Sequence, residues 1–247
     1  MAGEMVTRAI IRSALAEGAC LDAIDWLEER DWALWAISKL PARLTTAYRQ
    51  ALLAHIQQDS DEARRLLSEP GAAAPLSEEE EARLLASVCR SPEAARATLS
   101  YPGAAAKLVR THRAALLASV QQCPFAARTL LAEPGAAGPL SGHEKSTMLA
   151  AVCRDPAAAW GALIYNELND AERATLLASV CRSPQSAAWL LKFSGLAHRL
   201  SLSERATLLE IVRRDPKWVE DLLAYPGRAN LSAEERSALM AAKGGCR

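Results

Sequence analysis

The sequence predicts an all-α fold of about six tandem helical hairpins, and two observations lead to this prediction. Prolines recur with gaps of 32, 32, 28 and 32 residues, at Pro92, Pro124, Pro156, Pro184 and Pro216. Each follows a segment whose apolar residues share one face of a helix, as Leu84, Leu85 and Val88 do. This period indicates a stacked array in which each repeat buries its apolar face against its neighbours.

The first helix of each repeat begins at a capping box. In Ser77-Glu78-Glu79-Glu80 the Ser77 side chain accepts a hydrogen bond from the first turn, and Glu80 reaches back to the cap. The same pattern recurs at Ser141/Glu144, Asn169/Glu172, Ser201/Glu204 and Ser232/Glu235. Val109 stands where Ser or Thr would cap, an irregularity that makes a consensus design unlikely.

The second helix of each repeat begins at a proline. Ser91 is the expected N-cap, and Pro92 takes the first helical position, where its missing N–H has no partner to lose. An earlier second helix is expected to begin at Asp59-Ser60. Pro-Gly turns are expected to end these helices at Pro70-Gly71, Pro102-Gly103, Pro134-Gly135 and Pro226-Gly227.

These signals divide the chain into three consecutive parts of one array. Residues 1–44 keep a helical periodicity without the proline marks, and are predicted to form an N-terminal cap that contains Trp26, Trp32 and Trp35. Residues 45–231 hold the tandem two-helix repeats, with a shortened loop near Asn166. Residues 232–247 are predicted to be a C-terminal capping helix with a frayed end.

Two capped antiparallel helices per repeat resemble the α-solenoid proteins, namely the tetratricopeptide, HEAT, armadillo and pentatricopeptide arrays. The resemblance rests on the repeat length and the helix count, and implies a right-handed superhelix with a concave binding face. The 32-residue length is also similar to that of the DNA-reading arrays of transcription-activator-like effectors. Those arrays vary a residue pair between the two helices, whereas here the second member of each pair is mostly a helix cap, as at Arg90-Ser91.

Composition and charge argue against several classes of function. The 29 basic and 29 acidic side chains give a formal net charge of zero, which speaks against a general nucleic-acid binder. No apolar run has the length of a membrane span, and Glu4, Arg8 and Arg12 interrupt any signal-peptide core. We therefore expect a cytoplasmic protein without membrane attachment.

No residue pattern points to catalysis, a cofactor or a metal site. The histidines lie at non-equivalent positions without the spacing of zinc ligands. Cys89, Cys153 and Cys181 share one repeat position, but equivalent helices about 10 Å apart are too distant for a disulfide. We expect these cysteines to be reduced, partly buried thiols.

Two arginine columns are candidates for a surface that binds a partner. Arg90, Arg154, Arg182 and Arg214 end the first helices, where the helix dipole favours a cation, although a basic stripe is the alternative. The second column lies four positions after the proline register and runs Arg64, Arg96, Arg128, Trp160, Ala188, Glu220. Its change from basic to aromatic to acidic is what a binding face would show, and drift of a solvated surface explains it equally well.

Trp189 is the most specific single candidate. Its neighbours Ala187, Leu190 and Leu191 define the buried side of their helix, and Trp189 is predicted to project away from them. An exposed tryptophan is a favoured interface anchor, and the alternative is packing against the next repeat or against the turn Lys192-Phe193-Ser194-Gly195.

The sequence therefore predicts a non-catalytic scaffold or adaptor that binds a protein or peptide on the second-helix side of the array. The predicted binding residues are Arg64, Arg96, Arg128, Trp160 and Trp189. An acidic or amphipathic partner would suit them, with the chain itself a monomer or weakly self-associating. The alternatives are a nucleic-acid-binding array that uses the arginine columns and a structural protein that self-associates through its ends.

Overall fold

The computed structural model describes residues 33–34, 37, 46–68, 76–100, 105–133, 139–165, 168–192, 199–224 and 231–244. These residues fall into two compact units. The first unit holds the described residues up to Val120, and the second those from Gln121 onward. Apart from residues 33, 34 and 37, the predicted N-terminal cap lies outside the described residues, and so do its three tryptophans, the Pro-Gly turns and Asn166.

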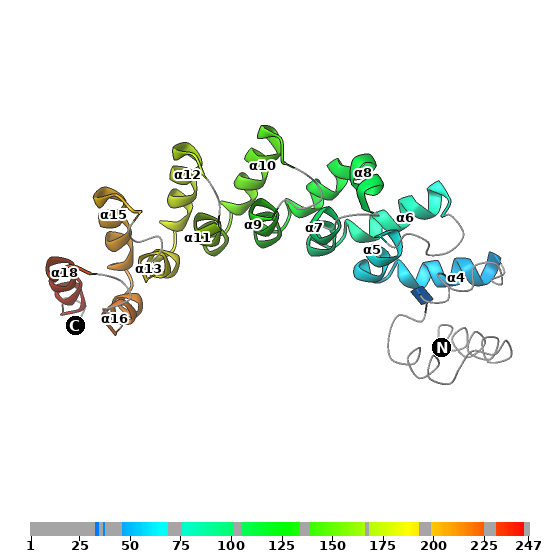
Figure 1. The fold of residues 1–247 in the computed structure, drawn as a ribbon. Coiled ribbons are helices and arrows are strands. Elements are labelled where there is room, and N and C mark those ends of the chain that lie inside the picture. Colours follow the sequence, from blue (N-terminus) through cyan, green and yellow to red (C-terminus); the bar gives the residue numbers. More distant parts are fainter. Residues whose placement is uncertain are drawn as a thin grey trace. The chain divides into compact units, whose positions relative to one another are not determined.

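The described residues form thirteen α-helices and no strand, which confirms the predicted all-α repeat array (Figure 1). The first unit holds α4 (Thr46–Ile56), α5 (Ser60–Ser68), α6 (Glu78–Val88), α7 (Pro92–Ser100) and α8 (Ala105–Val120). The second holds α9 (Pro124–Ala132), α10 (Gly142–Val152), α11 (Pro156–Tyr165), α12 (Asp170–Val180), α13 (Pro184–Lys192), α15 (Leu202–Val212), α16 (Pro216–Ala224) and α18 (Ala233–Gly244).

Within each unit the helices form two layers. We call the layer of first helices the A layer, and the layer of second helices, which begin at the proline register, the B layer. In the first unit α5 and α7 of the B layer contact each other and α4 contacts α6. In the second unit α9, α11, α13 and α16 contact one another in order as the B layer, opposite α10, α12, α15 and α18. Each B helix also contacts the A helix that follows it in its unit, as α11 contacts α12.

The capping boxes of the A helices are present as predicted. Ser77 Oγ accepts from the Glu80 amide at 3.2 Å, while the Glu80 carboxylate accepts from the Ser77 amide at 2.9 Å. The same reciprocal pair closes the first turn at Ser141, Asn169, Ser201 and Ser232. Two of the backbone donors that a helix start leaves open are thereby satisfied at each of these helices.

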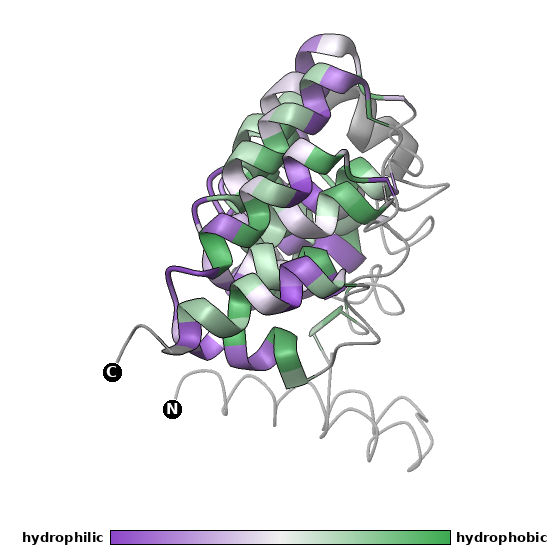
Figure 2. Cartoon of the chain, turned by 90° about the vertical axis from the view of Figure 1, so that its left-hand side faces the viewer, coloured by the Kyte–Doolittle hydropathy of each residue, from purple (hydrophilic) through white to green (hydrophobic). Residues whose placement is uncertain are grey.

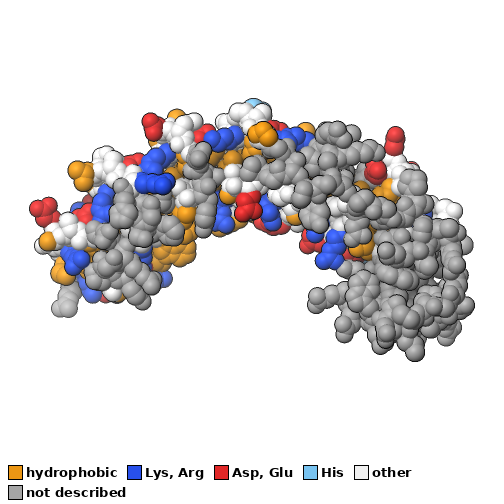
Figure 3. Space-filling model, in the orientation of Figure 1, with side chains coloured by type: hydrophobic (Ala, Val, Ile, Leu, Met, Phe, Trp, Pro, Cys, Tyr) orange, Lys and Arg blue, Asp and Glu red, His pale blue; other side chains and the backbone are white. Residues whose placement is uncertain are grey.

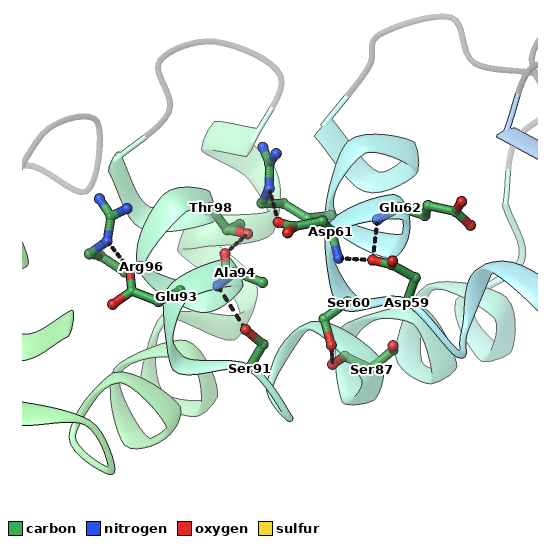
Figure 4. A network of polar contacts seen from close by, with 11 residues as sticks. Asp59, Ser60, Asp61, Glu62, Ser87, Ser91, Glu93, Ala94, Arg96 and Thr98 are labelled. Carbon is green, nitrogen blue, oxygen red and sulfur yellow. Dashed lines mark hydrogen bonds and ion pairs between the residues drawn. The ribbon is translucent and has the colours of Figure 1, made fainter. Parts of the chain in front are cut away.

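The B helices begin at the predicted caps. Asp155 Oδ1 accepts from the amides of Ala157 and Ala158 at 2.7 and 2.9 Å, directly ahead of α11. Asp59 does the same at the start of α5, and Ser91 Oγ accepts from the Ala94 amide at the start of α7 (Figure 4). Cys123 makes no side-chain cap, and α9 starts on its proline alone.

The core lies between the two layers of each unit. The leucine pair and the valine of each A helix face inward, as with Leu176, Leu177 and Val180, which are 0 to 9% exposed. Consecutive alanines on the B helices, such as Ala158 and Ala159, are fully buried, and their small size lets neighbouring helices approach closely. Figure 2 shows that the described helices contain both hydrophobic and hydrophilic residues along their length.

The carboxyl end of an A helix is held by the next repeat. Ser179 Oγ donates to the Cys153 carbonyl at 2.8 Å, and the Arg182 guanidinium donates to the same oxygen. Ser87 and Arg90 bind the Gln57 carbonyl in the same way, and Arg154 binds that of Gln121. These bonds satisfy carbonyls that a helix end leaves without intrahelical donors. Arg90, Arg154 and Arg182 therefore have a structural role, and the carbonyl that each binds belongs to the preceding repeat rather than to its own helix.

An ion pair joins successive A helices at their amino ends. Arg205, one position after the capping glutamate of α15, donates to both oxygens of Glu235, the capping glutamate of α18, at 2.5 and 3.0 Å. Equivalent pairs join Arg49 to Glu80, Lys145 to Glu172 and Arg173 to Glu204. Each of these glutamates therefore has two roles: it caps its own helix, and it pairs with a basic side chain of the preceding repeat. We call these four contacts the capping ladder.

The backbone of α8 is irregular at one residue. The backbone of α8 is continuous from Ala105 to Val120 except at His112, where φ is −122° and ψ is 15°. The leucine register places His112 where the other A helices carry their capping glutamate. Because Val109 cannot form a capping box, no cap marks a helix start at this position, and the helical segment extends back to Ala105.

The capping ladder predicts a measurable coupling between repeats. In a double-mutant cycle of Arg173→Ala and Glu204→Gln, we expect a coupling of about 0.5–1 kcal/mol in the free energy of unfolding, because both side chains are largely covered. The glutamine keeps an oxygen for the cap, so the cycle isolates the ion pair. The exposed pair Arg83–Glu79 on α6 is the control and should show about 0.3 kcal/mol or less. Equal couplings would contradict the ladder.

The same carboxylates predict acid sensitivity. Hydrogen bonds from Arg49, Lys145 and Arg205 lower the pKa of Glu80, Glu172 and Glu235, respectively, below the ordinary value of 4.5. For Glu204 burial raises the pKa, but the bonds from Arg173 and Ser201 together outweigh it, so its pKa is also lowered.

Because these pKa values are lower in the folded than in the unfolded chain, the ladder contributes its full stability above pH 4.5 and loses it as the pH falls through the folded values. We expect the melting temperature to fall steeply on acidification below that pH. Replacing Glu80, Glu172, Glu204 and Glu235 together by glutamine should flatten this acid limb. An unchanged limb in the fourfold variant would show that other groups control it.

Candidate functional site

The structure places the five predicted binding residues on five B helices of the two units. Arg64 lies on α5 and Arg96 on α7 in the first unit, while Arg128, Trp160 and Trp189 lie on α9, α11 and α13 in the second. In the second unit Trp160 contacts Trp189, and Arg128 lies against Gly161 of α11. The two arginines of the first unit pair with acids on their own helices.

Arg64 and Arg96 each pair with an acid one turn earlier on the same helix. Arg64 Nε lies 3.4 Å from Asp61 Oδ1, and Arg96 Nε lies 2.8 Å from Glu93 Oε2 (Figure 4). Both acids stand directly after the start of the B helix, so the pair occupies the same two positions in successive repeats. Exposed pairs of this kind compensate charge locally and contribute little stability.

Arg128 has an aromatic neighbour where Arg64 and Arg96 have an acid. Its guanidinium carbon lies 5.5 Å from the centroid of the Phe125 ring, within the range of a cation–π interaction. Its side chain also runs over α11: a Cβ added to Gly161 would lie only 2.8 Å from Arg128 Cδ. Gly161 thus provides the space in which Arg128 lies flat against the neighbouring helix.

Three tryptophans from successive B helices contact one another. The ring centroids of Trp160 and Trp189 are 5.6 Å apart at 64°, and those of Trp189 and Trp218 are 6.5 Å apart at 88°. Both are edge-to-face arrangements, which place the positive ring edge on the negative face of the neighbour. We call Trp160, Trp189 and Trp218 the tryptophan row.

The middle of the row reaches solvent. Trp189 is 38% exposed, while Ala187, Leu190 and Leu191 around it are at most 1% exposed, which confirms that it projects away from the buried side. Trp189 also packs between its two tryptophan neighbours, so the alternative of packing against the next repeat describes part of its environment. Phe125 on α9, near Arg128, is 42% exposed.

The sequence prediction missed Phe125, Trp218 and Lys217. Phe125 occupies the position of the acids Asp61 and Glu93. Trp218 occupies that of the buried alanines at 94, 126 and 158. Lys217 Nζ lies 5.1 Å from the Trp218 ring centroid, so the last tryptophan of the row also has a cation on its face.

Charged side chains are sparse along the centre of this face. Helix α11 carries none, and α13 carries only Lys192 at its last residue, where it pairs with Asp221 of α16. Figure 3 shows hydrophobic side chains gathered at the lower edge of the region where Figure 1 places α11 and α13. The second unit therefore presents an aromatic strip on its B layer, with Arg128 beside one end and Lys217 beside the other.

The shared cysteine position has no reactive character. Cys89, Cys153 and Cys181 are free and half-buried at the ends of their A helices, as predicted. Burial raises the pKa of all three thiols, which leaves little thiolate at neutral pH. Their backbone, rather than their sulfur, takes part in the contacts between repeats, as the Cys153 carbonyl shows.

The described residues contain no group of three histidine, cysteine or acidic side chains that could hold a metal ion. Three of the four histidines are described, and they lie on separate helices: His55 on α4, His112 on α8 and His143 on α10. No described helix combines the length and the apolar character needed to cross a lipid bilayer.

Comparisons with protein-family models, with curated proteins and with solved structures give no match for this chain.

Because Arg128 packs on Gly161, the effect of Gly161→Ala on the free energy of unfolding should depend on whether Arg128 is present. Gly→Ala in a helix normally stabilises by about 0.5–1 kcal/mol. In wild type, Gly161→Ala should lose that gain, because the new methyl group displaces Arg128. In an Arg128→Ala background the gain should reappear. Urea denaturation of the four proteins measures this, and the same effect in both backgrounds would contradict the packing.

Proposed function

We propose that this protein is a non-catalytic scaffold or adaptor that binds a protein or peptide on the B layer of its helical array. The observation that carries the proposal is the tryptophan row. Trp160, Trp189 and Trp218 come from three successive repeats and meet at one surface, and the central ring remains 38% exposed. Tryptophan and arginine are the residue types most enriched where binding energy concentrates.

The distribution of variable positions supports this assignment. Recurrent residues of the repeat cap helices or join neighbouring helices, as Glu204 and Arg182 do. The aromatic strip instead lies mostly at positions whose residue changes from repeat to repeat, such as those of Phe125, Trp160 and Trp189. Because no particular residue at these positions is needed to build a repeat, a role at the surface explains the aromatic residues better than a role in folding.

The geometry offers less support for nucleic-acid binding. That alternative depends on arginine columns that face phosphates. Arg90, Arg154 and Arg182 donate to backbone carbonyls of the preceding repeat. Arg64 and Arg96 are paired with acids on their own helices.

We propose further that the protein works without a cofactor, as a monomer or weakly self-associating chain, in a reducing compartment such as the cytoplasm. Four cysteines, at positions 89, 123, 153 and 181, are free. Half-buried thiols at helix ends are compatible with compartments where disulfides do not form.

The proposal predicts that partner capture depends on Trp189 and not on exposed apolar surface in general. Affinity capture from native lysate should yield partners with wild type that are lost with Trp189→Ala. The matched control is Leu202→Ala, which removes an 88% exposed apolar side chain from the A layer of the same unit.

Leu202→Ala should keep the wild-type melting temperature, since the side chain is 88% exposed. Trp189→Ala removes two ring contacts and should lower the melting temperature by a few degrees, so capture is compared at a temperature where both variants are folded. The same set of captured proteins with wild type and Trp189→Ala would overturn the assignment. Recovery of only the chain itself would instead identify the surface as a self-association site.

A further inference from the structure

We infer that the aromatic strip of the second unit recognises a short acidic amphipathic peptide segment, apolar in its centre and carrying carboxylates at both ends. The inference rests on the proposed function and names the partner's chemistry. The strip is defined by Phe125 and Arg128 on α9, the tryptophan row, and Lys217 on α16. The order of these residues along contacting B helices predicts the order of apolar and acidic residues in the ligand.

The centre of the strip selects an apolar segment. Trp189 presents ring surface to solvent between the flanking rings of Trp160 and Trp218. Helix α11 has no charged residue, and the single charge of α13 is paired with Asp221. A peptide with charges at its centre would leave them desolvated against these rings without partners, at a cost that an apolar side chain avoids.

The two ends of the strip select carboxylates. Arg128 and Lys217 each lie over an aromatic ring, and no ion pair to either is found among the described residues. The acids on the last B helix are engaged elsewhere, Glu220 with Lys243 at 3.0 Å and Asp221 with Lys192. Both ends therefore carry a cation held beside exposed apolar surface and available to a carboxylate.

Asp155 and Asp215, at the starts of α11 and α16, do not pair with Arg128 or Lys217 either. Asp155 caps α11 and Asp215 Oδ1 accepts from the Lys217 amide, so both carboxylates serve the helix starts. The first unit offers the contrast. Arg64 and Arg96 occupy the register of Arg128, but each has its own acid at the position that Phe125 takes. The exchange of acid for aromatic at that position creates a cation without a local carboxylate.

The length of the segment follows from the spacing of the helices. Packed neighbouring helices lie about 10 Å apart, so the three steps from α9 to α16 span about 30 Å. An extended peptide covers this distance with about nine residues, at about 3.3–3.6 Å each. A ligand of about twelve residues with acids near both ends would meet Arg128 and Lys217 together.

Selection from a random dodecapeptide display library tests the inference. Wild type is the target, and Trp189→Ala is the counter-selection. We expect enriched peptides with leucine, phenylalanine or tryptophan in the centre and aspartate or glutamate towards both ends. Synthetic copies should bind wild type about tenfold more tightly than the double variant Arg128→Gln, Lys217→Gln, as measured by fluorescence polarisation.

A charge-matched control separates local recognition from net charge. Arg214→Gln with Arg236→Gln removes two exposed arginines near the ends of A-layer helices in the same unit, and should leave the affinity within about twofold of wild type. Enriched peptides that need Trp189 but lack acids would overturn the inference and leave the proposed function standing. Failure to enrich any peptide that depends on Trp189 would overturn both.

Discussion

The double use of one glutamate is the constraint on which the repeat depends. At the start of an A helix, the third-position glutamate closes the capping box of its own helix and accepts an ion pair from the repeat before it, as Glu80, Glu172, Glu204 and Glu235 do. The side chain that defines where a helix begins therefore also fixes where the previous helix lies. Local structure and the contact between repeats are specified by the same residue.

The carboxyl end of the A helix is also joined to a neighbouring repeat. The last carbonyls of a helix have no intrahelical donors, and the next repeat supplies them from Ser179 and Arg182 or their equivalents. A residue pattern that looks like a basic column in the sequence is thus a set of backbone contacts. Since both ends of the A helices are used to build the array, the variable surface is left to the B layer.

Much of the fold was predictable because its signals are local. Capping boxes, the proline starts and the leucine–valine face each lie within one turn or one helix, and they place A and B helices correctly wherever the structure describes them. The position of Arg182 near the Cys153 carbonyl was not predictable, because it depends on the offset between two repeats. The helix dipole indicated its role without indicating its partner.

The candidate site was predicted in part for the same reason. Trp189 was identified from its direction on one helix, which is a local property. Its contact with Trp218 depends on how α13 packs on α16, since the two tryptophans occupy different repeat positions. Arg128 was identified as a variable position, but its place over Gly161 needed the structure. Phe125 could have been found from the sequence, because it replaces an acid at a fixed position.

We propose that the recurrent capping and ion-pair residues build the array and that the aromatic strip of the B layer binds a partner. The most direct measurement is an alanine scan of all described, non-buried positions of the second unit, scored for both melting temperature and affinity for a selected peptide. The account predicts that affinity losses cluster at Phe125, Arg128, Trp160, Trp189, Lys217 and Trp218, while losses of melting temperature cluster at the capping and ion-pair residues. This division would be contradicted if affinity were lost mainly at the capping ladder and alanine substitutions in the tryptophan row left affinity unchanged.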